Sequence, residues 1–85
     1  MNAQWFAVQS KPRQEGTAKV QLERQGYTAY LPMITLRKRK RAAWTASIEP
    51  LFPRYLFVQV DINEQSLTPV RSTMGVSGLV RFGAI

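Results

Sequence analysis

The first residues with an evident chemistry are cations. Five basic side chains follow one another in the segment RKRKR, and they are Arg37, Lys38, Arg39, Lys40 and Arg41. Clustered Lys and Arg side chains neutralise phosphates, and each neutralised phosphate steepens the salt dependence of binding to duplex DNA by about 0.9 log units per log unit of salt. We therefore expect this run to contact a polyanion without reading bases, because phosphates carry no sequence information. The alternative is a solvated hairpin tip that only aids solubility.

Two shorter polar segments, SKPRQ at 10–14 and RSTMGV at 71–76, lie at a predicted strand-to-helix corner and ahead of a predicted turn. Helix N-termini attract anions through their unpaired N–H groups. The polar residues that these segments contribute are Lys11, Arg13, Gln14, Arg71 and Thr73. Taken alone, each segment is better explained by ordinary capping or by a polar loop.

The residue types that carry most enzyme chemistry are missing. The chain has no Cys and no His, which removes disulfides, the usual zinc and copper ligands, and Ser–His or Cys–His nucleophile pairs. The few carboxylates show no paired spacing suited to acid–base catalysis. They are Glu15, Glu23, Glu49, Asp61 and Glu64. We therefore expect a non-enzymatic protein with no metal and no cofactor.

The overall composition favours a small domain that binds a polyanion. The chain has 85 residues, enough for one domain, and 45% of them are hydrophobic. Twelve Lys and Arg against five Asp and Glu give a net charge of +7, which attracts nucleic acid or an acidic surface. No apolar run of about 18 residues and no signal-like N-terminus occur. We therefore expect a cytoplasmic protein without a membrane span.

The elements that position these residues follow from periodicity and turn residues. The pattern predicts strands at 5–10, 27–34, 54–61 and 75–83, a helix at 11–26, a short helical turn and connector at 62–73, and a long exposed hairpin or loop at 35–50. This order predicts an α+β fold, with an antiparallel sheet of about four strands and helices on one face. The arrangement is the ferredoxin-like or split βαβ type, with an extended basic hairpin.

Local signals mark the ends of the first helix and of the second strand. Ser10 is the expected N-cap, Pro12 suits the first turn, and Gly26 is placed to end the helix. Pro32 suggests an edge or an end of the second strand.

Alternation along the third strand separates two faces. The expected core joins this strand, the first strand and the helix, and it consists of Phe6, Val8, Leu56, Val58, Val60, Ala18 and Leu22. Trp5, Tyr55 and Phe57 point to the opposite face, which helices on one side leave uncovered. Exposed aromatic residues there would form a docking surface. The alternative is that they pack under the hairpin or against a missing segment.

Phe52 precedes this strand between two prolines. Pro50 and Pro53 each fix φ and restrict the residue before them. The Phe is therefore held extended and has little entropy left to lose on binding. The alternative is a rigid approach to the strand in which Phe52 covers the sheet edge.

Together these residues resemble the N-terminal domain of the NusG family of transcription elongation factors. The resemblance is carried by WFAVQSKPRQE, GYTAYLP, PLFPRYLFV and RSTMGVSGLVRFG, in the family's order and spacing and over nearly the whole chain. LPMITL, EPLFPRYLFV and GVSGLVRFG look closest to the specialised RfaH branch of antitermination factors. The basic insert at 36–43 is a departure from that branch.

The resemblance implies a function and a fold. The family domain is a βαββαβ sheet that binds RNA polymerase at the clamp helices of the β′ subunit and reaches the gate loop of the β subunit. Bridging the two holds the clamp closed over nucleic acid and suppresses pausing and termination. We therefore expect a clamp-binding surface made of Phe52, Tyr55, Phe57, Phe82, Trp5 and Gln9. Gln9 stands where the RfaH branch has an aromatic residue.

The resemblance also implies two further contacts. The connector Ser66, Leu67 and Thr68 falls where the RfaH branch has a His-Thr-Thr gate-loop motif, which Thr68 alone matches. The two polar segments surround the face that reads the non-template DNA strand in that branch. Lys11, Gln14 and Thr73 match it by type, whereas Pro12 and Met74 replace basic residues.

Family members usually continue past the end of this sequence. They add a further helix, a linker and a small KOW barrel that contacts other factors or the ribosome. We therefore expect residues 1–85 to be a NusG-type N-terminal domain truncated before its last helix, with the C-terminal KOW domain absent.

The residues alone leave two other functional interpretations open. A free-standing single-stranded RNA-binding module of RRM-like topology would stack bases on Trp5, Tyr55 and Phe57 while RKRKR grips phosphates. The sequence lacks the glycine-aromatic RNP signature of that fold, and RYLFVQV is only weakly similar to it. The charge by itself would also suit a structural, ribosome-associated domain.

Overall fold

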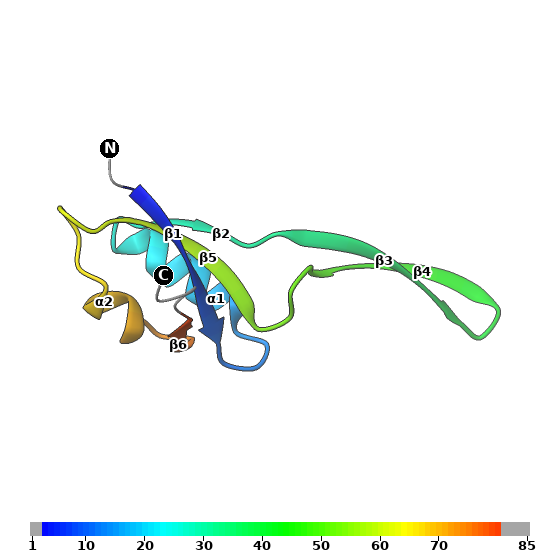
Figure 1. Ribbon diagram of the computed structural model, residues 1–85. Helices are drawn as coiled ribbons and strands as arrows, with labels where there is room; N and C mark the ends of the chain where they lie inside the picture. The colour runs from blue at the N-terminus through cyan, green and yellow to red at the C-terminus, as the bar shows by residue number, and fades with distance from the viewer. Residues whose placement is uncertain (1–2, 81–85) are drawn as a thin grey trace.

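The protein consists of a two-layer body and a projecting hairpin (Figure 1). The structure, a computed structural model, describes residues 3–80. Its elements in chain order are β1 (Ala3–Ser10), α1 (Glu15–Arg24), β2 (Thr28–Tyr30), β3 (Met33–Lys40), β4 (Ala43–Pro50), β5 (Tyr55–Asp61), α2 (Thr68–Arg71) and β6 (Val76–Val80). The hairpin makes the molecule elongated, with principal extents of 54 × 26 × 20 Å.

The body contains a four-stranded antiparallel sheet in the order β2-β5-β1-β6. β1 and β2 both run antiparallel to β5, which lies between them, and α1 connects them. A helix that joins two parallel strands across an intervening strand is a split βαβ unit. The structure therefore confirms the predicted α+β class and is compatible with the split βαβ arrangement.

The core lies between this sheet and the helices. The alternation predicted for β5 is confirmed, because Leu56, Val58 and Val60 are buried on the helix side. All seven predicted core residues contribute, Phe6 as a partly buried neighbour of the cluster. Each fully buried Val or Leu stabilises the fold by about 1.5–3 kcal/mol relative to exposure. Three core residues were not predicted, namely Tyr27, Val70 and Val76.

The start of α1 differs from the prediction. The helix begins at Glu15 instead of residue 11, and the N-cap position is Gln14, which makes no side-chain capping bond. Ser10 ends β1 and its hydroxyl donates to the Lys11 carbonyl at 3.0 Å, so the predicted Ser10 cap and the place of Pro12 in the first turn are wrong. The physical reason is Arg13, whose φ of 59° cannot belong to a right-handed helix.

The end of α1 is as predicted. Gly26 adopts a φ of +92°, and its N–H donates to the Glu23 carbonyl at 3.0 Å. The Tyr27 N–H donates to the Leu22 carbonyl at 3.2 Å. These two bonds form a Schellman cap, in which the residue with positive φ is usually Gly. The buried Tyr27 ring completes the cap by packing on the core.

The predicted strand at 27–34 is in fact two strands. β2 ends at Tyr30, and β3 begins at Met33 in a separate sheet. Pro32 causes the break, because it has no N–H to donate to a sheet ladder. Its carbonyl accepts a hydrogen bond from the Leu51 N–H at 2.8 Å, which joins the two strands at the base of the hairpin.

β3 and β4 form a two-stranded antiparallel sheet that runs from Met33 opposite Pro50 to Lys40 opposite Ala43. The turn between them has two residues, Arg41 and Ala42, with φ of 50° and 64°. Two positive φ values define a type I′ turn, which matches the twist of antiparallel strands and normally uses Asn and Gly.

The C-terminal part follows the predicted order of elements. The connector at 62–73 contains one short helix, α2, and the last strand spans Val76–Val80. The predicted strand residues 81–83 lie outside the described residues. Between residues 3 and 80, neither helix is long and apolar enough to cross a membrane.

Candidate functional site

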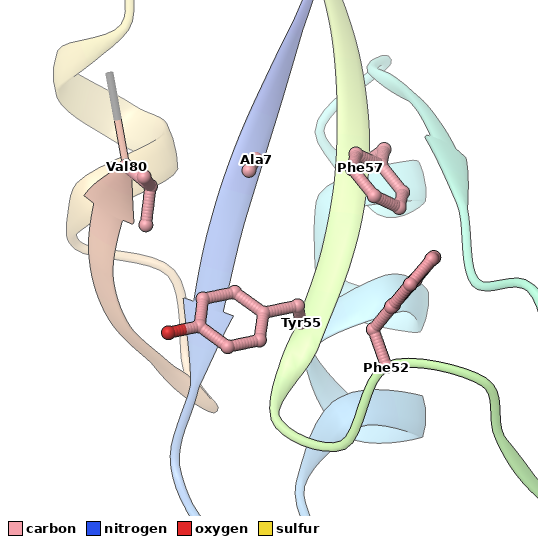
Figure 2. A pocket seen from close by; sticks show the side chains of 5 residues that line it. All are labelled: Ala7, Phe52, Tyr55, Phe57 and Val80. Atoms are coloured by element: carbon pink, nitrogen blue, oxygen red, sulfur yellow. The ribbon is translucent and has the colours of Figure 1, made fainter. Parts of the chain in front are cut away.

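The helix-free face of the sheet carries an open apolar groove of about 420 Å³ (Figure 2). Its lining comes from β1, β5, β6 and the segment before β5, and consists of Ala7, Phe52, Tyr55, Phe57 and Val80. In Figure 2 the helix α1 lies behind the sheet, on the side away from these side chains.

The groove exists because a small residue lies between large ones. Ala7 on the central strand β1 is directly opposite Phe57 on one side and Val80 on the other. Directly paired residues of a sheet point to the same face. The methyl group of Ala7 therefore forms the floor, and the larger side chains of the neighbouring strands form the walls.

Phe52 closes the groove at the end where the chain enters β5. Its ring meets the Phe57 ring edge to face, with centroids 6.0 Å apart and planes at 86°. The Phe52 carbonyl also accepts a hydrogen bond from the Tyr55 N–H at 3.0 Å. Edge-to-face pairs contribute about 0.5–1.5 kcal/mol beyond area burial. Phe52 nevertheless stays 47% exposed, so it is placed by the protein and still available to a partner.

Arg54 and Glu15 hold the segment that carries Phe52. Arg54 has a φ of 70°, and its N–H donates to the Glu15 carboxylate at 3.0 Å. Its carbonyl accepts from the Ser10 N–H at 2.7 Å, and its Nε donates to the Ser10 carbonyl at 3.3 Å. This junction could not be predicted, because the partners are far apart along the chain and a positive φ at Arg has no sequence signal.

The other predicted clamp-binding residues flank the groove along β1. Trp5 is 50% exposed, precedes Ala7 by two residues in β1 and points to the same face. Gln9 is half-buried opposite Tyr55. Phe82 lies outside the described residues.

Tyr30 extends the aromatic surface and was not predicted to do so. It lies directly opposite Phe57 on β2, on the helix-free face, and is 57% exposed. Alternation within β2 separates Tyr30 from Ala29, but the place of Tyr30 beside Phe57 depends on the pairing of β2 with β5, which the sequence does not show.

The predicted gate-loop residues precede and begin α2. Leu67 is half-buried and packs against the core. The Ser66 carbonyl accepts from the Tyr27 hydroxyl at 2.7 Å, and its Oγ accepts from the Thr68 N–H at 3.1 Å. Ser66 and Thr68 are exposed. Two residues of this connector are therefore accessible, while Leu67 anchors it.

The two polar segments that the sequence treats separately meet in space. The Lys11 N–H donates to the Gly75 carbonyl at 2.8 Å. Gly75 has a φ of +89°, and a Cβ there would lie 3.0 Å from the backbone nitrogen of Ala18. Only Gly fits this close approach between the loop and α1. The contact brings segment 71–76 beside segment 10–14.

We call the surface formed by segments 10–14 and 71–76 the basic corner. Its side chains differ in exposure. Lys11, Arg13 and Arg71 are exposed. Thr73 is only 6% exposed; its hydroxyl accepts from Gln25 Nε2 and donates to the Pro69 carbonyl, both at 2.7 Å. Cations therefore face solvent at this corner, whereas Thr73 joins α1 to α2.

The five consecutive cations lie on β3 and in its turn, at the far end of the hairpin. Lys38 Nζ lies 2.9 Å from a Glu49 oxygen. The Ser47 hydroxyl donates a hydrogen bond of 2.6 Å to the same carboxylate. This bond, followed by the interaction with Lys38, holds the pKa of Glu49 below its ordinary value. In the part of the chain that the structure describes, no three His, Cys, Asp or Glu side chains gather as a metal site would require.

A family model described as transcription termination factor nusG matches residues 3–84. The match includes β1, α1, the aromatic groove and the basic corner, and it spans nearly the whole chain. The sheet with its two helices is compatible with the N-terminal domain of that family. The chain therefore belongs to the NusG family of transcription factors.

Proposed function

We propose that this chain is a non-enzymatic elongation and antitermination module that binds RNA polymerase through the aromatic groove. The observation that carries the proposal is the groove itself, whose five lining side chains are apolar apart from one Tyr hydroxyl. The proposed occupant is the coiled coil formed by the clamp helices of the β′ subunit. Side chains that project from a helix fit a groove with a small floor and aromatic walls.

A second contact at Ser66 and Thr68 would reach the β-subunit gate loop. Binding both parts of the polymerase favours the closed clamp, because a ligand shifts an equilibrium by its differential affinity for the two states. The module would thus stabilise the processive state over the paused one. We further propose that the chain is an RfaH-like specialised factor, because the segments LPMITL and GVSGLVRFG resemble that branch.

The basic corner would hold the non-template DNA strand during this bridging. Lys11, Arg13 and Arg71 are exposed there with no carboxylate partner among the described ion pairs. The half-buried Gln14 at the start of α1 is the polar group nearest to base edges in this proposal. The extended basic hairpin adds a second cationic region.

The test is capture of the chain by an isolated β′ clamp coiled coil. We expect the double variant Phe52→Ala, Phe57→Ala to lose binding by at least about 30-fold, as truncation of two central aromatic anchors does in other interfaces. Val20→Ala is the matched control, because Val20 is as exposed as Phe52 but lies on α1. Undiminished capture of the double variant, with its fold intact by circular dichroism, would remove the groove from the proposal.

One observation favours a second candidate, a free-standing RNA-binding module. Trp5, Tyr30 and Tyr55 are exposed on a helix-free antiparallel sheet, where aromatic rings stack bases in RRM folds. Submicromolar RNA binding that is lost in Tyr55→Ala, together with no capture by the clamp coiled coil, would support this candidate instead.

A further inference from the structure

The alternation of β3 and β4 divides the hairpin cations between two faces. Arg37 and Arg39 point to one face, and Lys38 and Lys40 point to the other. The two faces therefore differ in chemistry although the cations are consecutive in sequence. We name the first the arginine face.

The arginine face also carries an exposed tryptophan. Trp44 on β4 is directly opposite Arg39, and Ala46 is directly opposite Arg37. Trp44 is 68% exposed. A hollow of about 340 Å³ is lined by Arg37, Trp44 and Ala46 of this face and by Thr45, which is paired with Lys38. The small side chain of Ala46 leaves space between the indole ring and the Arg37 guanidinium.

The lysine face is electrostatically different. Lys38 is paired with Glu49, and the same carboxylate accepts a hydrogen bond from Ser47. The residues of β3 and β4 that share the arginine face include no carboxylate. One face thus has its charge partly neutralised, whereas the other has two guanidinium groups beside a large aromatic ring.

We propose that the arginine face binds single-stranded RNA, with one base stacked on Trp44 and the flanking phosphates held by Arg37 and Arg39. Bases stack on aromatic side chains and on guanidinium planes, but only where they are not already stacked in a duplex. An indole directly opposite Arg39 and diagonal to Arg37 therefore fits an unpaired base and its two phosphates. A purely electrostatic contact would need no exposed Trp.

The choice of RNA over DNA rests on the proposed function. There the basic corner beside β1 takes the non-template DNA strand. Strands of eight residues, rising about 3.3 Å per residue, carry the tip of the hairpin about 26 Å from its base. A nucleic-acid strand bound at the hairpin tip is then not the non-template DNA strand. The second single strand that a transcribing polymerase exposes is the nascent RNA.

The first arm of the test needs no polymerase. Fluorescence anisotropy would follow the 85-residue chain binding a labelled single-stranded RNA of about 12 nucleotides, and the same RNA annealed to its complement. We expect the single strand to bind more tightly than the duplex. Trp44→Ala should weaken binding of the single strand by about 5- to 100-fold, whereas Trp44→Phe should retain most of it.

Arg39→Gln and Lys40→Gln form a matched pair, because they remove one charge each from neighbouring residues on opposite faces. We expect Arg39→Gln to lower the salt slope by about 0.7, the value for one phosphate on a single strand. Lys40→Gln should leave the slope unchanged. Equal effects of the two variants, full binding by Trp44→Ala, or tighter binding of the duplex would each overturn the proposal.

The second arm identifies the strand in polymerase elongation complexes. One set carries 4-thiouridine in the RNA, and the other carries 4-thiothymidine in the non-template DNA. We expect a photocrosslink from the RNA that disappears in Trp44→Ala. A Trp44-dependent crosslink from the DNA instead, or none from the RNA while the chain is bound to polymerase, would overturn the choice of RNA. If the chain fails to bind polymerase, the proposed function fails, and the first arm still decides whether the arginine face binds single strands.

Discussion

Replacing Ala7 by Leu tests the groove without removing any of its aromatic walls. Ala7 is only 4% exposed, and it forms the floor between Phe57 and Val80. Leu adds three carbon atoms at this position. They would enter the groove of about 420 Å³ on the helix-free face. The core is on the other face, where Val8 points.

The expected effects on folding and on binding are of different size. The added carbons would contact Phe57 and Val80 in an open groove, so we expect the free energy of unfolding to change by no more than about 1 kcal/mol. A partner side chain that inserts over Ala7 would lose its site. Full burial of one aliphatic side chain contributes about 1.5–3 kcal/mol, so affinity for the clamp coiled coil should fall by roughly 10- to 150-fold.

Isothermal titration calorimetry with the clamp coiled coil measures the affinity, and urea denaturation measures the fold. Ala3→Leu is the matched control, since Ala3 is on the same strand and the same face but pairs with Asp61, away from the groove. Wild-type affinity in a folded Ala7→Leu variant would refute the groove as the docking surface. An unfolded variant would refute the geometry itself, because it would mean that the space above Ala7 is not open.

Three further predictions concern stability. Gly75→Ala should destabilise the domain by at least about 1–2 kcal/mol in urea denaturation, because φ is +89° and the new Cβ would lie 3.0 Å from backbone; an unchanged midpoint would contradict the close approach. Arg41→Asn with Ala42→Gly should slow amide exchange in the hairpin, since both residues have positive φ; faster exchange would argue against the type I′ turn. The pKa of Glu49 is lowered by the Ser47 hydroxyl and by the ion pair with Lys38. The contribution of Glu49 to hairpin stability is therefore present above the ordinary Glu pKa and is lost as pH falls through the lower pKa of the folded state. Hairpin NMR shifts that stay constant through this acid range would contradict this prediction.

The sequence predicted the body of the fold where side-chain alternation was strong. In β5, the aliphatic residues Leu56, Val58 and Val60 occupy every second position, so both faces and most of the core followed directly. The end of α1 was equally predictable, because Gly26 is a residue type that favours positive φ. The groove walls Tyr55 and Phe57 were found by the same alternation.

The parts that sequence reasoning missed depend on backbone states or on distant partners. Arg13 and Arg54 have positive φ, which no residue type signals when it is not Gly, Asn or Asp. Arg13 moved the start of α1, and Arg54 fixes Phe52 through Glu15. Tyr30 joined the aromatic face only through its pairing with Phe57, which is a tertiary contact.

Under the proposed function, these missed contacts would let one small domain hold the clamp helices and the DNA strand together. Bridging gains affinity only when both contacts are held at a spacing that matches their targets. Here the segment carrying Phe52 is bonded through Arg54 to Ser10 and Glu15, which border the basic corner. The groove and the corner thus share one hydrogen-bonded junction. Glu15→Gln weakens that junction but keeps its shape, so it should lower affinity for a polymerase–DNA complex more than affinity for the clamp coiled coil alone. Equal losses in the two titrations would show that the junction only supports Phe52 and does not set the spacing.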